Sequence, residues 1–251
     1  MRRTHKRLGS LLLVMAMLLT LLPVSAMAAD DDTAPINPNP VSNETELKSA
    51  VANAVDGTET TIMLGADIAL ANTLAIPAGK NIVLNLNGCA VTVPPADNGR
   101  SIYAVDNYGT LTICDMSAEK DGSISSRGVE NYGTMTLESG TINSIDSNGG
   151  GAAVWNEATF NMSGGTLAFT GTKTDSGSGI ALNNQADATT TITGGTLRAN
   201  YACVFNSGNM NIENALLTGG DKYWNVIKVF GGSNLVLRNV TVNAQYGAAL
   251  K

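Results

Sequence analysis

Carboxylate and aromatic side chains share one position of a motif that recurs along this chain. The motif is a small aliphatic residue, a variable residue and an asparagine, and glycine replaces the asparagine in its last copy. The variable residue is, in chain order, Asp106, Glu130, Trp155, Asn183, Phe205 and Phe230. Two neighbouring carboxylates can serve as the acid and the nucleophile of a glycosidase, whereas exposed aromatic rings stack on sugars or on a protein partner. The variable position of the motif therefore allows two interpretations, a catalytic site and a binding surface.

The asparagines of the motif recur at nearly constant spacing. They are Asn107, Asn131, Asn156, Asn184 and Asn206, separated by 24, 25, 28 and 22 residues, and Gly231 follows after a further 25. A repeat of this length indicates one turn of a solenoid. In successive corners each amide can hydrogen-bond the next amide and the turn backbone, which satisfies polar groups that the corner buries. We therefore expect a structural asparagine ladder, interrupted at Gly231.

Short alternating segments fill the rest of each repeat. A strand such as residues 134–137 ends on an inward aliphatic, and another aliphatic follows five residues later across a glycine, as in Met162/Leu167 and Ile192/Leu197. Three short strands and three corners then make one coil, and equivalent strands of successive coils run in parallel. The sequence predicts an all-β chain, a right-handed parallel β-helix of about seven coils.

The N-terminal region divides into three parts. Residues 1–28 combine Arg2, Arg3, Lys6 and Arg7 with an apolar run and the small residues Ala26 and Ala28, which is typical of a secretory signal peptide. Residues 29–42 are rich in aspartate and proline and are expected to be a flexible leader. The β-helix domain is assigned to residues 43–251, opening with a capping helix near 45–55.

The capping helix has a start signal, an apolar stripe and a stop signal. Its predicted determinants are Asn43 or Thr45 as the N-cap, Leu47, Val51, Ala54 and Val55 as the stripe, and Gly57 at the end.

Charge and composition exclude several partners and chemistries. Without residues 1–28 the chain keeps 11 Lys and Arg against 21 Asp and Glu, a formal net charge of about −10. An acidic surface disfavours nucleic acid and anionic membranes, so neither is expected as a partner. The only histidine, His5, lies in the signal segment. No cofactor motif and no metal-ligand spacing is present, so no cofactor and no metal are expected.

The three cysteines do not have the spacing of a metal site. Cys89, Cys114 and Cys203 are expected to be small packing residues, and a bridge between Cys89 and Cys114 stays open because these two fall in successive coils.

With its asparagine ladder the chain resembles right-handed parallel β-helix proteins of the pectate-lyase-like superfamily. Its first segments, Glu46–Lys48 through Asp56–Gly57, Thr61–Leu64, Ile76–Lys80 and Leu84–Gly88, resemble the N-terminal cap and first coils of secreted, adhesin-like β-helix proteins of Gram-positive gut bacteria. The resemblance covers about residues 43–251. It is specific for the fold, whereas this superfamily hosts many functions.

Enzymes of that superfamily act mainly on polysaccharides, and their motifs are not found here. The Gly-His-Gly motif of the polygalacturonase type is excluded once His5 is removed. The remaining catalytic alternative is Asp106 with Glu130, expected about 5 Å apart on neighbouring coils. Two carboxylates in register on any adjacent coils meet that distance, so the spacing alone has little diagnostic value.

The aromatic residues of the motif allow two interpretations, which the sequence leaves open. Trp155, Phe205 and Phe230 either stand exposed on one stacked face, or are covered by variable loops and form a satellite cluster. The loops in question span residues 94–100, 143–151, 168–179 and 218–224. A threonine array, with Thr110, Thr134 and Thr189 among its members, is reminiscent of ice-binding β-helices, although strands favour outward threonine in any case.

The expected function is that of a secreted, non-enzymatic, adhesin-like surface protein. We expect Trp155, Phe205, Phe230 and Asn183 to bind an extracellular glycan or a surface protein, with a polysaccharide lyase or glycoside hydrolase as the alternative. After signal cleavage no membrane insertion is expected. The last coil begins at Gly247 and lacks a polar cap, so we expect either a missing C-terminal region or end-to-end pairing with another chain.

Overall fold

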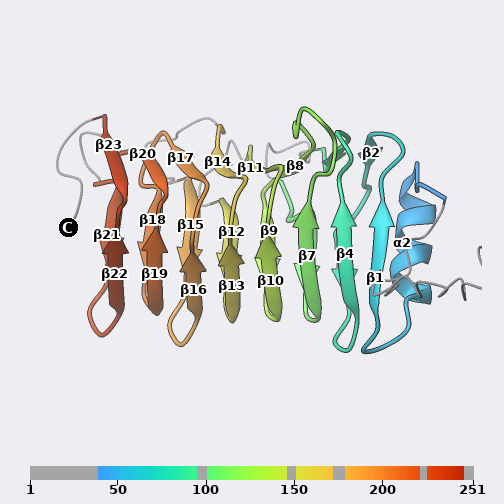
Figure 1. Cartoon of the computed structure of the whole chain (residues 1–251), viewed down its shortest axis with the longest axis horizontal. Coiled ribbons are helices and arrows are strands. Elements are labelled where there is room, and N and C mark those ends of the chain that lie inside the picture. Colours follow the sequence, from blue (N-terminus) through green and yellow to red (C-terminus); the bar gives the residue numbers. More distant parts are fainter. Residues whose placement is uncertain (1–38, 95–100, 146–150, 172–178, 221–224, 246–251) are drawn as a thin grey trace, which may run out of the picture. The chain divides into compact units, whose positions relative to one another are not determined.

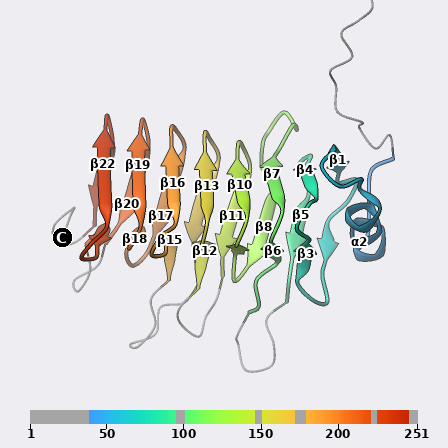
Figure 2. The ribbon, with the colours of Figure 1, turned by 90° about the horizontal axis from the view of Figure 1, so that it is seen from below.

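The computed structural model describes residues 39–94, 101–145, 151–171, 179–220 and 225–245. Within the compact unit formed by residues 34–251, the described strands make three parallel sheets. Strands that follow one another in the chain belong to different sheets, so the chain visits each sheet in turn (Figure 1). Figure 2 shows the strands of single coils, such as β15, β16 and β17, lying together. The predicted parallel β-helix is confirmed.

The first sheet has eight strands, in spatial order β1 (Glu59–Met63), β4 (Asn81–Asn85), β7 (Thr110–Cys114), β10 (Thr134–Leu137), β13 (Thr159–Met162), β16 (Thr189–Ile192), β19 (Asn209–Glu213) and β22 (Asn234–Arg238). The second also has eight, β2 (Ile68–Ala69), β5 (Ala90–Thr92), β8 (Ser123–Ser126), β11 (Thr141–Ser144), β14 (Thr166–Phe169), β17 (Thr196–Ala199), β20 (Leu216–Gly219) and β23 (Thr241–Ala244). The third has seven, β3 (Leu74–Ile76), β6 (Val105–Asn107), β9 (Val129–Asn131), β12 (Ala152–Asn156), β15 (Ile180–Asn184), β18 (Val204–Asn206) and β21 (Ile227–Val229). Two sheets thus hold one strand more than the seven coils expected.

The core is built from inward aliphatic side chains stacked in register. In the first sheet this column is Ile62, Leu84, Ile113, Leu137, Met162, Ile192 and Ile212, each at most 2 % exposed. Burying a side chain of this size contributes about 1.5–3 kcal/mol. A slip of one residue would turn the column outward, so the core fixes the register of every strand.

The outer face of the same sheet carries the threonine array. Thr110, Thr134, Thr159 and Thr189 stand in register on four successive strands, followed by Asn209 and Asn234. Thr159 extends the array beyond the threonines singled out in the sequence.

The asparagine ladder is present and fully buried. Each side-chain amide donates to the side-chain oxygen of the next asparagine, from Asn107 to Asn131, Asn156, Asn184 and Asn206, over 2.7, 2.7, 2.9 and 2.8 Å. The oxygens of Asn131, Asn156 and Asn206 also accept the backbone N–H two residues on, over 3.3 Å in each case. The ladder therefore satisfies the corner backbone as expected.

The predicted end of the ladder was placed two residues too far along the chain. Val229, and not Gly231, pairs with Asn206, because Ile227 takes the inward position that Val204 holds in the coil before. Ile227 and Val229 are both aliphatic and alternate, so the sequence pattern fits either register. Val229 replaces the amide with an aliphatic side chain, which cannot continue the ladder.

Helix α2 (Glu44–Asn53) lies beside β1 (Figure 1). The Asn43 side chain accepts the Glu46 N–H over 3.0 Å, and the Glu46 carboxylate accepts the N–H of Ser42, the residue before the N-cap, over 2.8 Å, an arrangement related to the capping box. Leu47 and Val51 are buried as predicted. Lys80 donates to the carbonyls of Ala52 and Ala54 at the helix end, where a positive charge is favourable.

Two residues near this helix differ from the sequence expectation. Val55 is exposed and does not belong to the apolar stripe, because the helix ends at Asn53 and the chain turns there. Val41, placed in the leader, is buried and forms a parallel bridge with Leu64, so the ordered unit begins before residue 43.

The strand at the far end of the first sheet is more exposed than its equivalents. Leu237 continues the inward column yet is 37 % exposed, because the described part of the chain pairs β22 with β19 alone. Cys89, Cys114 and Cys203 are free thiols, so the bridge left open between Cys89 and Cys114 is absent.

Several expectations fall outside the described residues. They are the signal peptide at 1–28, most of the leader, the start of the last coil at Gly247 and the central parts of the four loops expected beside the third sheet. In the part of the chain that the structure describes, no helix is long and apolar enough to cross a membrane.

Candidate functional site

The outer face of the third sheet brings the predicted site residues into one row. Asp106, Glu130, Trp155, Asn183 and Phe205 pair in register from β6 to β18, as the motif predicts. The next member is Lys228, which pairs with Phe205 in the place predicted for Phe230. The cause is the same as at the end of the ladder. In β21 the residues that pair with Phe205 and Asn206 are Lys228 and Val229, each two positions before the predicted Phe230 and Gly231. We call these six residues the outer row.

A second row of side chains, which the repeat motif does not include, follows directly after the ladder. The backbone N–H of each member donates to the ladder-position carbonyl of the preceding coil. We call it the corner row, and its members are Tyr108, Tyr132, Glu157, Gln185, Ser207 and Phe230. The signal was available, because Asn-Tyr-Gly occurs twice, at residues 107–109 and 131–133.

Tyr108 and Tyr132 form an exposed aromatic stack. Their ring centroids lie 5.0 Å apart and their planes differ by 4°. The two side chains are nevertheless 50 % and 41 % exposed. Aromatic rings held parallel at one coil step present a rigid apolar surface at low cost in side-chain entropy.

Carboxylates accompany these rings within each coil. Tyr132 donates its hydroxyl to Glu130 in the same coil, and Trp155 donates its indole N–H to Glu157 over 2.7 Å in the next. Aromatic and acidic residues thus exchange rows between β9 and β12. We define Asp106, Tyr108, Glu130, Tyr132, Trp155 and Glu157 as the acid–aromatic patch.

The charges of the patch act on one another. Partial burial, and then the Glu130 charge on the neighbouring strand, raise the pKa of Asp106 above its ordinary value. Burial and the hydrogen bond to Glu130 raise the pKa of Tyr132, so this hydroxyl stays protonated at physiological pH. Two carboxylates in register on adjacent strands repel, and nothing within the patch itself is positively charged.

Two of the three predicted aromatics belong to a satellite cluster, whereas the cover by variable loops lies largely outside the described residues. Trp155 and Phe205 pack against a small cluster outside the main core, formed by Ala152, Ile180, Tyr201 and Ala202. Asn183, between them in the outer row, is 8 % exposed. These three side chains are therefore less available to a large ligand than the sequence pattern predicts.

Phe230 is exposed and forms a separate group with Lys228 and Phe205. The Phe230 ring meets Phe205 edge to face with centroids 5.6 Å apart, and the Lys228 ammonium lies 4.9 Å from the Phe230 centroid. Four strand steps separate β21 from β9 in the third sheet, so Lys228 cannot complete one site with Glu130.

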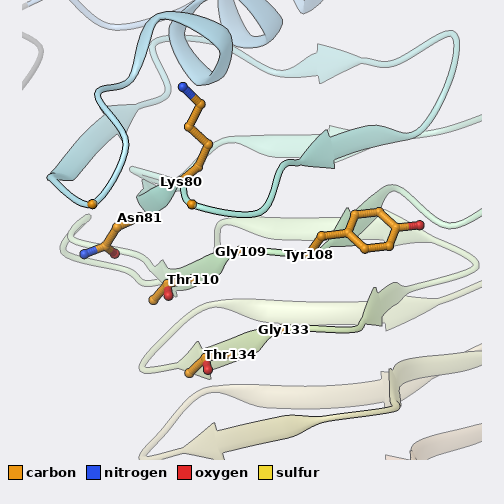
Figure 3. Close-up of a pocket in the computed structure, with 9 residues that line it drawn as sticks. Lys80, Asn81, Tyr108, Gly109, Thr110, Gly133 and Thr134 are labelled. Atoms are coloured by element: carbon orange, nitrogen blue, oxygen red, sulfur yellow. The ribbon is translucent and has the colours of Figure 1, made fainter.

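An open groove runs beside Tyr108 at the corner between the third and first sheets. Its lining is Gly57, Gly79, Lys80, Asn81, Tyr108, Gly109, Thr110, Gly133 and Thr134. In Figure 3 Lys80 extends toward the helix, while Tyr108 lies at the opposite end of the groove from Thr110 and Thr134. Glycine at the corner is required by packing, because a Cβ on Gly133 would overlap the carbonyl oxygen of Gly109.

The described residues contain no group of three or more His, Cys, Asp and Glu side chains that could hold a metal ion. The arrangement is chemically a flat, acidic and aromatic surface with an adjacent groove. Such a surface can stack on rings and accept hydrogen bonds, and its carboxylate pair can exchange protons.

Comparisons of the chain with protein-family models, curated proteins and solved structures gave no match. The assignment to the parallel β-helix architecture therefore rests on the three sheets and their register.

Proposed function

We propose that this chain is a secreted, non-enzymatic, adhesin-like β-helix protein of the pectate-lyase-like superfamily. In this proposal it binds an extracellular glycan or a surface protein through the outer face of the third sheet. The observation that carries the proposal is the exposed, parallel stack of Tyr108 and Tyr132 beside the Asp106 and Glu130 carboxylates. Large exposed aromatic side chains are costly in water and mark interaction surfaces.

The architecture supports a binding role. A rigid sheet holds the rings and carboxylates at one coil step, so little order has to be imposed when a ligand binds. The secreted location rests on the signal-peptide pattern at residues 1–28. N-terminal sequencing of the protein released by a Gram-positive host is expected to begin at Ala29, and a first residue upstream of this site would contradict cleavage there.

The binding proposal is tested on a glycan array with the chain lacking residues 1–28. Tyr108→Ala removes one exposed ring, and Thr189→Ala, on the outer face of the first sheet, is the matched control. A stacking contact contributes about 0.5–1.5 kcal/mol, so we expect up to about a tenfold loss of affinity in Tyr108→Ala. Equal binding by wild type, Tyr108→Ala and Thr189→Ala would reject this face.

A second candidate is a polysaccharide lyase or glycoside hydrolase. The specific observation in its favour is the in-register pair Asp106 and Glu130, in which Asp106 has a raised pKa and Glu130 accepts from Tyr132. Two neighbouring carboxyl groups, of which one has a raised pKa, are a feature of retaining glycosidases. Incubation with polygalacturonate, alginate and host glycans, with and without calcium, tests it. Turnover abolished by Asp106→Asn or Glu130→Gln would overturn the non-enzymatic proposal.

A further inference from the structure

The acid–aromatic patch has the composition of a surface for a cation that also carries an apolar face. It joins three carboxylates to three aromatic rings across β6, β9 and β12 and includes no basic residue. Asp106 and Glu130 lie opposite each other on adjacent strands, where two like charges are unfavourable. A positive group placed between these carboxylates would relieve the repulsion, so the charge complementarity of the patch is cationic.

The tyrosine stack adds a second requirement to the ligand. Tyr108 and Tyr132 are 50 % and 41 % exposed although their rings stack on each other, so a large part of both side chains is open to a ligand. Aromatic rings attract cations by their electron-rich faces and attract flat, C–H-rich surfaces by stacking. The Glu130 carboxylate lies close enough to the Tyr132 hydroxyl to raise its pKa, so ring and carboxylate are neighbours within one coil. A ligand must therefore present its charge and its apolar surface close together.

The topology favours a sugar over a peptide strand. Strands β6, β9 and β12 are each paired on both sides in the third sheet, so they offer no free edge to which an extended peptide could add. A peptide would have to order several flexible side chains, whereas a pyranose ring is already rigid. A ring that bears an ammonium group combines a stacking surface and a charge in one unit.

We propose that the acid–aromatic patch binds glycans that carry unacetylated amino sugars. The sugar ring lies against Tyr108 and Tyr132, and its protonated amino group lies between the carboxylates of Asp106 and Glu130. This inference rests on the proposed binding function and names the ligand class of the same face. Acidic polysaccharides are excluded from the patch by the same carboxylates.

The test uses two probes of the same length, an oligomer of glucosamine and the corresponding oligomer of N-acetylglucosamine. Affinities of the chain lacking residues 1–28 are measured by calorimetry at low and at high salt. The glucosamine oligomer is expected to bind at least about tenfold more tightly, and this preference is expected to shrink at high salt because exposed charges are screened. Equal affinities for the two oligomers would overturn the inference.

Matched variants locate the effect. Glu130→Gln removes one charge inside the patch, and Glu138→Gln removes one exposed charge outside it, so both change the net charge equally. The preference for glucosamine is expected to fall in Glu130→Gln and to stay in Glu138→Gln, with the far-ultraviolet circular dichroism unchanged. Asp106→Asn repeats the test should Glu130→Gln disturb the fold. An equal loss in the inside and outside variants would overturn a local role for the patch.

The failure of this inference is distinguishable from failure of the proposed function. Binding of both oligomers, lost in Tyr108→Ala and indifferent to Glu130→Gln, keeps the glycan-binding face and rejects the amino-sugar preference. A lysine-rich peptide that binds as tightly as glucosamine oligomers, with the same sensitivity to Glu130→Gln, shows recognition of charge alone and also rejects it.

Discussion

At the scale of single residues, buried asparagine amides form the hydrogen bonds to corner backbone groups that water forms in exposed turns. Asn131 donates to Asn156, Gly133 and Thr159 and accepts from Asn107 and Gly133, so each of its polar atoms has a partner at a fully buried corner. Removal of one amide leaves several of these groups buried without a partner, which costs more than the lost bonds contributed.

Asn131→Leu is therefore expected to lower the free energy of unfolding by about 1–3 kcal/mol. The measurement is the midpoint of denaturant unfolding. The same substitution at Asn211, which points outward on β19 and is exposed, is the control and is expected to change the midpoint little. A midpoint for Asn131→Leu equal to that of Asn211→Leu would contradict the structural role of the ladder.

The carboxylate pair predicts a pH effect with a definite sign. Because the pKa of Asp106 is raised in the folded state above its ordinary value of 3.8, its ionised form destabilises the fold as the pH rises through the raised pKa. Asp106→Asn is thus expected to have a higher thermal midpoint than wild type at neutral pH. Thermal scans across pH should show this difference vanish in acid, where Asp106 is neutral, and a lower midpoint of the variant at neutral pH would contradict it.

At the scale of elements, the corners between sheets decide how closely coils approach. Gly109 and Gly133 leave the corner between the third and first sheets without side chains, and this opens the groove beside Tyr108. The tight corner also constrains the backbone of the tyrosine that precedes each glycine, so the stack depends on backbone packing as well as on ring contacts.

Gly133→Ala is expected to destabilise the protein by about 1–3 kcal/mol, because its Cβ would overlap the Gly109 carbonyl oxygen. Gly231→Ala is the matched control, since no atom lies within 4 Å of the added Cβ. Chemical denaturation of both variants checks the difference. Equal denaturation midpoints for the two variants would show that the corner accommodates the added methyl group without loss of stability.

The sequence predicts strands and corners where core packing imposes a local pattern of residues. It does not predict features that depend on ambiguous registers or on contacts with other coils. The column through Leu137 and the ladder through Asn131 were predictable because inward side chains and buried amides tolerate few alternatives. Phe230 was misplaced because Ile227 and Val229 both suit an inward position. Trp155 packs against a cluster whose members Ile180, Tyr201 and Ala202 come from other coils, so no local sequence pattern predicts its partial burial.

At the scale of the whole molecule, the two described ends of the coil stack differ. Helix α2 covers the β1 end with Leu47 and Val51, whereas Leu237 on β22 is 37 % exposed in a column that is otherwise buried. Exposed backbone groups of a terminal strand can pair with another chain. End-to-end pairing through β22 therefore stays a prediction of the fold.

Hydrogen exchange of the isolated monomer tests this end. Amides of β22 are expected to exchange at least about tenfold faster than those of β10, because in the described part of the chain β22 is paired on one side only and such a strand opens more easily. Exchange in β22 that slows with rising protein concentration would support pairing of two chains. A monomer in which β22 is protected as well as β10 would contradict the expected weakness of this end.

Binding at the third sheet is tested most directly by the crystal structure of the chain with a glycan selected on the array. The expected result is a sugar ring in van der Waals contact with Tyr108 and Tyr132 and a polar group within hydrogen-bond distance of Asp106 or Glu130. A glycan seated instead on the threonine face of the first sheet or against β22, with Tyr108 and Tyr132 bare, would contradict the proposed site.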